Sequence, residues 1–279
     1  MRLFHYTSLQ AAEQIIPSGL LRATEIHYLN DAAELSHAVS RFRAALQSLS
    51  TSYHDHTRLL SQLHTWLSER ISNGNWLFVV CFTEQGDLLS QWRGYTPHGQ
   101  GVSIGFGIDH LLSRATDQQY EFGKCIYETH KQTALAEHAM RAVLSHAKQK
   151  GPVPTSEAHP SQAYFPAFQE CETTLLRIAA LMKHDAFEAE HEWRAVSKAV
   201  TEFRGQNVQY RAGRSTMVPY VHFFLKREGE PEMGIEEAIH GPTPHQNLAV
   251  AALSNFLIRY SVFCGGRRVS ASRVPYRET

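Results

Sequence analysis

The alternation of hydrophobic and polar residues along the chain predicts a mixture of strands and helices. The longest apolar run, Trp76–Phe82, is rich in β-branched and aromatic residues and has the length of a strand. We therefore expect a central strand that is buried on both faces. Gly101–Phe106 alternates large apolar residues with small ones, which is typical of a strand. Further extended segments are expected at Leu3–Tyr6, Leu20–Leu29, Lys124–Tyr127, Glu192–Ser197, Val208–Arg211, Val218–Leu225, Ile235–His240 and Val269–Ser272.

Helical periodicity and capping residues predict the helices. Thr7, with Gln10 three residues later, is the expected N-cap of a first helix, and Pro17-Ser18-Gly19 is expected to end it. One short helical turn is expected at Leu88–Arg93. Longer helices are expected over Ala32–Ile71 with a break near Ser50–Ser52, over Thr129–Lys150, over about Ser161–Lys183 and over about His245–Arg259.

This order of elements predicts the fold class. Strands near both ends of the chain with helices between them indicate a single α+β domain over residues 1–279, with a mixed or antiparallel central sheet. We expect helical insertions at about residues 32–72 and 129–185. Gly151–Pro154 is the most linker-like stretch, and we expect it to separate helices rather than domains.

Composition narrows the functional class. The 279 residues carry 27 basic and 27 acidic side chains, and this zero net charge argues against binding to nucleic acid or anionic lipid by bulk charge. No apolar run approaches the roughly 18 residues of a membrane span, and Met1–Thr7 does not resemble a secretory signal. The four cysteines are scattered and suit reduced thiols. We expect a cytoplasmic protein with no membrane contact.

Candidate ligand contacts lie where the first strand meets the first helix, at His5, Tyr6 and Thr7. A helix N-terminus offers free backbone N–H groups and the positive end of the helix dipole, which suit phosphate and other polar ligands. The alternative is a buried histidine next to a helix cap.

A second candidate segment, Ser90–Tyr95, places amide, indole, guanidinium and phenol groups within six residues. Trp92, Arg93 and Tyr95 could together stack against a planar ligand and hold an anion. The alternative is that these residues fix a loop onto the sheet.

Three glutamates alternate along the chain at Glu188, Glu190 and Glu192, directly before Trp193-Arg194. In a strand, residues two apart face the same side, so Glu190 and Glu192 are expected to project together. Two carboxylates in one cleft repel each other, which raises one pKa and favours acid–base work or stabilisation of a cation. The alternative is a solvated edge strand.

Other candidate sites are weaker. His54, His56 and His64 lack the cysteine or carboxylate partners of a metal site, so we expect no metal. The chain contains no P-loop, no G-x-S-x-G and no H-E-x-x-H motif. The basic stretch from Gly265 to Arg277 could hold phosphate, although a solvated tail is the more frequent outcome.

Several segments, taken in order, together carry a resemblance to a known family. They are Phe4–Ser8, Ile26–Asp31 with Glu34, Cys81–Glu84, Leu89–Tyr95, Gly99–Phe106, Lys183-His184 through Phe187, Glu190, Glu192–Arg194, Val218–Tyr220, His240–Pro242, and Ser272 through Arg277. These segments resemble a bacterial family of domains of unknown function, DUF2971. The resemblance spans nearly the whole chain and is collinear. The family name implies no activity.

A second resemblance rests on a histidine of the first strand in an H-x-T context (His5), an aromatic residue in the next extended segment (Tyr28) and a glutamate on a late strand (Glu192). This set is similar to the histidine, tyrosine and glutamate of ADP-ribosyltransferases and related NAD-cleaving toxins. It implies that His5 hydrogen-bonds the NAD ribose, that Tyr28 stacks on nicotinamide and that Glu192 stabilises the ribosyl cation. Tyr6 and Tyr95 compete with Tyr28 for the tyrosine role. It also implies a split central sheet, although the two helical insertions stretch the family's spacing.

The resemblance to these enzymes implies an NAD-consuming enzyme that takes NAD as co-substrate, transfers ADP-ribose to a macromolecule or to water, and acts as a bacterial toxin or anti-phage effector. Two alternatives stay open. One is a non-catalytic module that binds a nucleotide or a protein through Trp92, Arg93 and Tyr276-Arg277. The other is a metal-dependent nuclease that uses His5 and the glutamates around a divalent ion. The expected cofactor contacts are Tyr6, Thr7, Asn30, Trp92, Arg93, Tyr95, Glu190 and Arg194.

Overall fold

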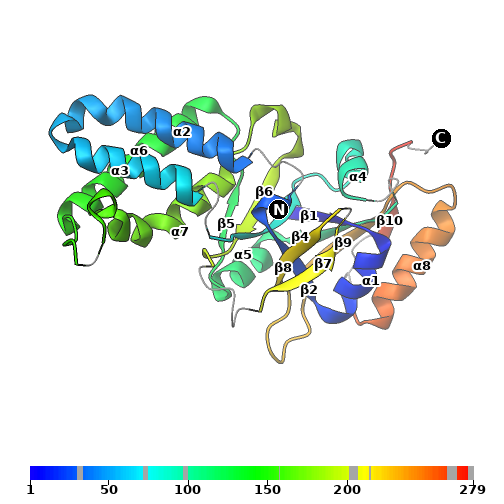
Figure 1. Ribbon diagram of the computed structural model, residues 1–279. Coiled ribbons are helices and arrows are strands. Elements are labelled where there is room, and N and C mark those ends of the chain that lie inside the picture. The colour runs from blue at the N-terminus through cyan, green and yellow to red at the C-terminus, as the bar shows by residue number, and fades with distance from the viewer. Residues whose placement is uncertain are drawn as a thin grey trace.

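A ten-stranded sheet and a lobe of helices beside it make up the fold (Figure 1). The computed structural model describes residues 1–29, 34–71, 75–96, 100–156, 158–200, 207–213, 215–262 and 269–275 of the chain. Helices and strands intermix along the sequence, and this confirms the predicted α+β class.

The strands follow the order β10-β9-β4-β1-β3-β2-β8-β7, and β6 and β5 branch from β3. Among the described residues every strand pair is antiparallel except β10 beside β9, so the predicted mixed sheet is confirmed. The strands are β1 (Arg2–Thr7), β2 (Leu20–Glu25), β3 (Phe78–Thr83), β4 (Val102–Gly107), β5 (Glu121–Lys124), β6 (Glu192–Val196), β7 (Gln209–Ala212), β8 (Met217–Phe224), β9 (Ile235–His240) and β10 (Val269–Ala271).

The sheet forks at β3, because two strands share one of its edges. β6 pairs with β3 along its length, from Val79 to Thr83, and so occupies one edge. At the other edge, β1 pairs only with the end at Thr83, whereas β2 pairs only with the opposite end at Phe78 and Val79. β1 and β2 therefore diverge and leave an opening near Cys81, in the middle of β3.

Three helices cover one face of the sheet. The apolar residues of α1 (Leu9–Ser18), α5 (Ile108–Asp117) and α8 (Gln246–Arg259) share a core with the alternate apolar residues of β1 to β4. Burial of these side chains supplies the main driving force for this layer. The sheet contributes among others Leu3, Leu21, Ala23, Phe78, Val80, Phe82, Val102, Ile104 and Phe106.

The helical lobe has its own core and stands to one side of the sheet (Figure 1). It consists of α2 (Glu34–Leu49), α3 (Thr57–Trp66), α6 (Thr129–Lys150) and α7 (Phe165–Leu181). Val79 of β3 and Val196 of β6 belong to the same core, so the lobe is anchored to the sheet beside the fork. No helix in these described ranges is long and apolar enough to cross a membrane.

Some predicted boundaries are wrong. The first helix is capped by Ser8, whose Oγ accepts the N–H of Ala11 at 3.0 Å, and not by Thr7, which pairs with Val102 as the last residue of β1. The extended segment from Leu20 ends at Glu25, because the Glu25 carboxylate accepts the N–H of His27 and caps a 3₁₀ turn over Ile26–Tyr28.

Two other elements differ from the expectation. The strand expected at Lys124–Tyr127 is β5, which lies earlier, at Glu121–Lys124. After it, the chain instead bonds through Ile126 to Leu181 at the end of α7. The sequence also did not predict α5, which starts directly after β4. The expected short turn is α4 (Leu89–Tyr95).

Candidate functional site

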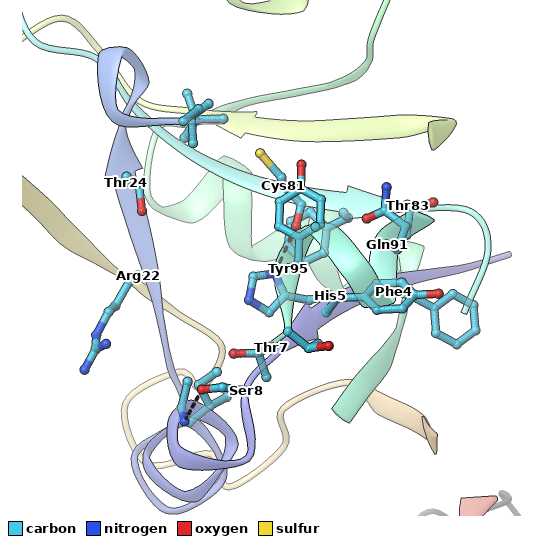
Figure 2. Close-up of a pocket in the computed structure, with 18 of the residues that line it drawn as sticks. Phe4, His5, Thr7, Ser8, Arg22, Thr24, Cys81, Thr83, Gln91 and Tyr95 are labelled. Carbon is cyan, nitrogen blue, oxygen red and sulfur yellow. Dashed lines mark hydrogen bonds between the residues drawn. The ribbon is translucent and has the colours of Figure 1, made fainter. Parts of the chain in front are cut away.

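A cavity of about 1470 Å³ lies over the fork and the neighbouring sheet face. This volume exceeds the roughly 300–1,000 Å³ that is common for small-molecule sites, so an extended ligand fits. Residues of β1, α1, β2, β3, α4, β6, β7 and β8 line it. Figure 2 shows the two sides of the fork, with Arg22 and Thr24 on β2 and with His5 and Thr7 on β1.

Strand register explains why polar residues gather on this sheet face. Directly opposite residues in an antiparallel pair face the same side. Cys81 of β3 lies opposite Arg194 of β6, and Thr83 lies opposite Glu192. On the other arm of the fork, Arg22 and Thr24 of β2 lie opposite His222 and Tyr220 of β8. The face opposite to the α1–α5–α8 layer is thus polar over several strands.

His5 fills the opening of the fork. Backbone groups along a strand alternate between its two edges, and Phe78 bonds through its N–H and C=O toward the β6 side. Cys81, three residues on, therefore presents its carbonyl to the opening. His5 Nδ1 lies 3.0 Å from that carbonyl (Figure 2). Since a carbonyl only accepts, Nδ1 carries the proton and donates.

The neutral imidazole leaves one nitrogen available. Burial lowers the pKa of His5, although the hydrogen bond to the Cys81 carbonyl opposes this shift. At neutral pH the ring is uncharged and Nε2 is an acceptor. No partner for Nε2 is found in the ranges that the structure describes. His5 can thus accept a hydrogen bond from a hydroxyl group in the cavity.

A buried ion cluster forms the wall at β6. Arg194 donates from Nε to Oε1 and from Nη2 to Oε2 of Glu192, both at 3.0 Å. Lys183 Nζ donates to the same Oε2 at 2.5 Å. Burial raises the pKa of Glu192, but the positive charges of Arg194 and Lys183 outweigh it and lower this pKa to about 2. Glu192 is therefore ionised at all physiological pH values.

Glu190 is the more accessible carboxylate of the cluster. Its side chain is 20 % exposed, against 4 % for Glu192, and its Oε2 accepts from Lys183 Nζ at 2.6 Å. Its Oε1 has no hydrogen-bond partner among the described residues. This oxygen can accept a hydrogen bond from a ligand or carry a negative charge toward it.

The prediction that Glu190 and Glu192 lie on one strand is wrong. Glu190 ends the 3₁₀ turn Asp185–Glu190, and His191 adopts a left-handed backbone with φ of 43° before β6 begins at Glu192. The expected mutual repulsion is wrong as well, because Lys183 Nζ bridges the two carboxylates. The pKa of Glu192 is lowered rather than raised.

Two tyrosines and an arginine complete the lining next to the fork. Tyr28 is 40 % exposed and lies at the end of the 3₁₀ turn that follows β2. Burial, followed by the negative charge of Glu192, raises the pKa of Tyr95, so this phenol stays protonated. Arg93 is exposed on α4 and also lines the cavity. These side chains offer an aromatic surface and a cation to a bound ligand.

Trp92 of α4 is buried against β1, outside the cavity lining. Its side chain is fully buried, its Nε1 donates to Asp87 Oδ1 at 2.8 Å, and its ring packs edge-on against Tyr6 at 4.6 Å. The Tyr6 hydroxyl donates to the Gln85 carbonyl and accepts the N–H of Leu88. Trp92 thus holds the loop after β3 and does not line the cavity, whereas Arg93 and Tyr95 of the same segment do line it. For Trp92 alone, the structure favours the alternative of fixing a loop onto the sheet.

The structure brings most predicted site residues to one cavity. His5, Tyr28 and Glu192, which are up to 187 residues apart in the sequence, all line it. Asn30 lies outside the described residues, as do Tyr276 and Arg277. The chemical roles of all these residues stay predictions. The other expected contacts that line the cavity are Tyr6, Thr7, Arg93, Tyr95, Glu190 and Arg194.

Several lining residues were not singled out from the sequence. Lys183 belongs to one of the segments that resemble DUF2971, but the sequence assigns it no role. It lies seven and nine residues before the glutamates that it bridges, a spacing that does not predict this contact. Arg22 could have been found, because Arg22 and Thr24 alternate with the buried Leu21 and Ala23 of β2. Cys81, Arg211 and His222 line the cavity as well, and the sequence did not single them out as ligand contacts.

The described residues contain no cluster of side chains that could bind a metal ion. No group of three or more histidine, cysteine, aspartate or glutamate side chains there is arranged to hold an ion. His56 and His64 lie on or beside α3 in the helical lobe, and the side chain of His54 falls outside the described set.

Comparison with known proteins finds that a segment containing part of this site is similar to a sequence family. Residues 91–195 match the family described as "Protein of unknown function (DUF2971)", which confirms the predicted resemblance over that segment. The matched segment contains Tyr95 of α4, Lys183, Glu190, and both Glu192 and Arg194 of β6. No curated protein and no solved structure matches the chain.

Proposed function

We propose that the cavity binds a dinucleotide of the NAD type and that the protein cleaves its nicotinamide–ribose bond. One observation carries the proposal: the forked sheet brings His5 of β1, Tyr28 after β2 and the carboxylate of Glu190 beside β6 to a single cavity of dinucleotide size. A site with a neutral imidazole, an aromatic ring and an ionised carboxylate suits a sugar with a planar, positively charged leaving group.

The bond that breaks joins the ribose C1′ carbon to the nicotinamide nitrogen. Its electron pair leaves with nicotinamide, which becomes neutral, and the ribose passes through a cationic state like that of glycoside hydrolysis. Water, or a hydroxyl or amine of an acceptor, adds to C1′ and loses one proton to solvent. Atoms, electrons and protons balance in this reaction without an oxidant or a metal ion.

Glu190 is the carboxylate that best supports this transition state. Both Glu192 oxygens are already hydrogen-bonded to Arg194 and Lys183, whereas Glu190 Oε1 has no hydrogen-bond partner among the described residues. A fixed negative charge beside C1′ stabilises the developing positive charge without reorganisation. We therefore assign the cation-stabilising role to Glu190 and a positioning role to Glu192, which holds Lys183 and Arg194 in place.

The remaining contacts orient the substrate. His5 Nε2 can accept from a ribose hydroxyl, since Nδ1 is fixed on the Cys81 carbonyl. The half-exposed ring of Tyr28 can stack on nicotinamide, and Arg93 can approach a phosphate. Orientation of this kind contributes through proximity rather than through acid strength.

Nicotinamide release from NAD tests the proposal. We expect the full chain to release nicotinamide, and Glu190→Gln to reduce the rate by about 10²–10³-fold while the thermal midpoint of unfolding stays within a few degrees. Glu188→Gln is the matched control, because Glu188 is exposed on the same turn and does not line the cavity. Absence of release, or equal release by Glu190→Gln, contradicts the proposal.

The same activity implies a cellular role. Loss of NAD would stop bacterial growth, so we also propose a cytoplasmic toxin or anti-phage effector that consumes NAD or transfers ADP-ribose to a macromolecule. Expression of the chain should lower cellular NAD and slow growth, and Glu190→Gln should relieve both effects. Growth arrest with unchanged NAD contradicts this role.

One observation favours a second candidate function. The hydrogen bonds of the Glu192 carboxylate are complete within the protein, as is typical of a rigid binding wall. A non-catalytic nucleotide-binding module would raise its unfolding temperature on addition of NAD or ADP-ribose without release of nicotinamide. The two measurements on one sample therefore separate enzyme from binding module.

A further inference from the structure

Three cationic or titratable side chains gather on the sheet arm away from the fork. Arg22 of β2 lies directly opposite His222 of β8, so both project from the same face. Arg211 of β7 lies opposite Val218, which is on the His222 face because residues two apart share a side. Arg22, Arg211 and His222 all line the cavity.

These charges lack an internal counter-charge in the described ranges. Arg22 Nη2 donates to the neutral amide oxygen Gln14 Oε1 at 2.5 Å, and its guanidinium lies 5.2 Å from the centre of the Tyr220 ring. Neither Arg22 nor Arg211 forms an ion pair with a carboxylate among the described residues. Burial, followed by the charge of Arg22, lowers the pKa values of both Arg211 and His222. The two guanidinium groups face the same side of the sheet, two strands apart, and their like charges repel each other.

We propose that Arg22, Arg211 and His222 form an anion subsite that binds the phosphate groups of an organic diphosphate whose sugar enters the fork. The planar guanidinium groups of Arg22 and Arg211 match phosphate oxygens and can bind them through two hydrogen bonds. An anion between the two guanidinium groups removes their repulsion, so binding relieves an unfavourable arrangement.

The position of the subsite suits an extended ligand. β7, β8, β2 and β3 are successive neighbours, so at about 4.8 Å per strand the subsite and the fork are separated by up to roughly 14 Å. Thr24 of β2 and Val79 of β3 line the cavity between them. The inference rests on the proposed function only in taking the ligand to be a dinucleotide. The anion chemistry itself rests on the sheet register, the shared cavity and the missing carboxylate partners of the two arginines, and not on NAD cleavage.

Calorimetric titration of the full chain with inorganic pyrophosphate and with ADP-ribose tests the subsite. We expect both probes to bind, and the double variant Arg22→Gln/Arg211→Gln to weaken each by about 10- to 100-fold, since charge-assisted hydrogen bonds are lost. Arg259→Gln is the matched control. Arg259 is exposed on α8, so this substitution removes one positive charge outside the cavity. Unchanged thermal unfolding of the variants shows that the fold is kept.

The outcomes separate the subsite from the proposed function. Binding of ADP-ribose that depends on the two arginines, without nicotinamide release by the wild-type chain, supports the subsite and contradicts NAD cleavage. Nicotinamide release with an unchanged KM for NAD in the double variant contradicts the subsite and leaves cleavage intact. Failure of the wild-type chain to bind either probe, or equal binding by the double variant, overturns the subsite.

Discussion

The two ends of the cavity handle charge in opposite ways. Beside the fork, Glu192 is enclosed by Arg194 and Lys183, and the charges of this cluster are matched within the protein. On the β2–β8–β7 arm, Arg22 and Arg211 line the same cavity without a carboxylate partner in the described residues. Register places both sets on one sheet face, so position alone does not explain the contrast.

The contrast separates stability from binding. Removal of one partner from a matched buried cluster leaves an uncompensated buried charge, so it is expected to destabilise the fold strongly. Since its charges are already matched within the protein, such a cluster is expected to change little when a ligand binds. An unmatched cationic pair contributes little to stability and is expected to respond strongly to an anion. Substitutions at the two ends should therefore affect different measurements.

The largest effect is expected from Arg194→Met. This change leaves the Glu192 carboxylate buried without its bidentate partner, and it also removes the hydrogen bond from Nη1 to the Ala180 carbonyl. We expect the free energy of unfolding to fall by about 3–5 kcal/mol, measured by urea denaturation at pH 7. A loss below about 1 kcal/mol would show that the fork cluster is not structural.

The pH dependence of stability tests whether the ionised Glu192 carboxylate stabilises the fold. The pKa of Glu192 is about 2 in the folded protein, below its ordinary value of 4.5. The carboxylate therefore contributes its full stabilisation above pH 4.5, and this contribution is lost as the pH falls from 4.5 toward 2. Over that window the stability advantage of wild type over Glu192→Gln should shrink by on the order of 3 kcal/mol. An advantage that stays constant down to pH 2.5 contradicts the assignment.

A smaller effect is expected for Trp92→Phe, which tests whether this residue supports the wall or contacts the ligand. The change removes the hydrogen bond from the indole to Asp87, a carboxylate that also accepts from Ser272 and Arg273. We expect a loss of about 2 kcal/mol in unfolding free energy and an unchanged Kd for ADP-ribose. Weaker binding at unchanged stability would instead support the stacking role expected from the sequence.

Much of the fold could be predicted because local sequence determines it. The apolar run in β3 and the helix Thr129–Lys150 are fixed by composition, periodicity and the Gly151 that follows. The fork could not be predicted in this way. It depends on which ends of β3 pair with β1 and β2, and that register arises from contacts between residues up to about 80 positions apart.

The candidate site shows the same division. The resemblance to ADP-ribosyltransferases selected His5, Tyr28 and Glu192, which the fold brings to one cavity. The expected rise of a glutamate pKa was wrong for Glu192. Its pKa depends on Arg194 and Lys183, whose side chains are placed around it only by the tertiary structure. Two glutamates in the sequence do not reveal a lysine between them.

Arg22→Gln, on the β2–β8–β7 arm of the cavity, is expected to change stability least. Arg22 forms no ion pair with a carboxylate among the described residues, and its positive charge repels that of Arg211. Its loss should leave the unfolding free energy within about 0.5 kcal/mol of wild type, while the Kd for ADP-ribose rises. Urea denaturation and calorimetry on the same sample measure both quantities. If stability fell by more than 1 kcal/mol and affinity did not change, Arg22 would be a structural residue, and the division of the cavity into a matched and an unmatched end would be wrong.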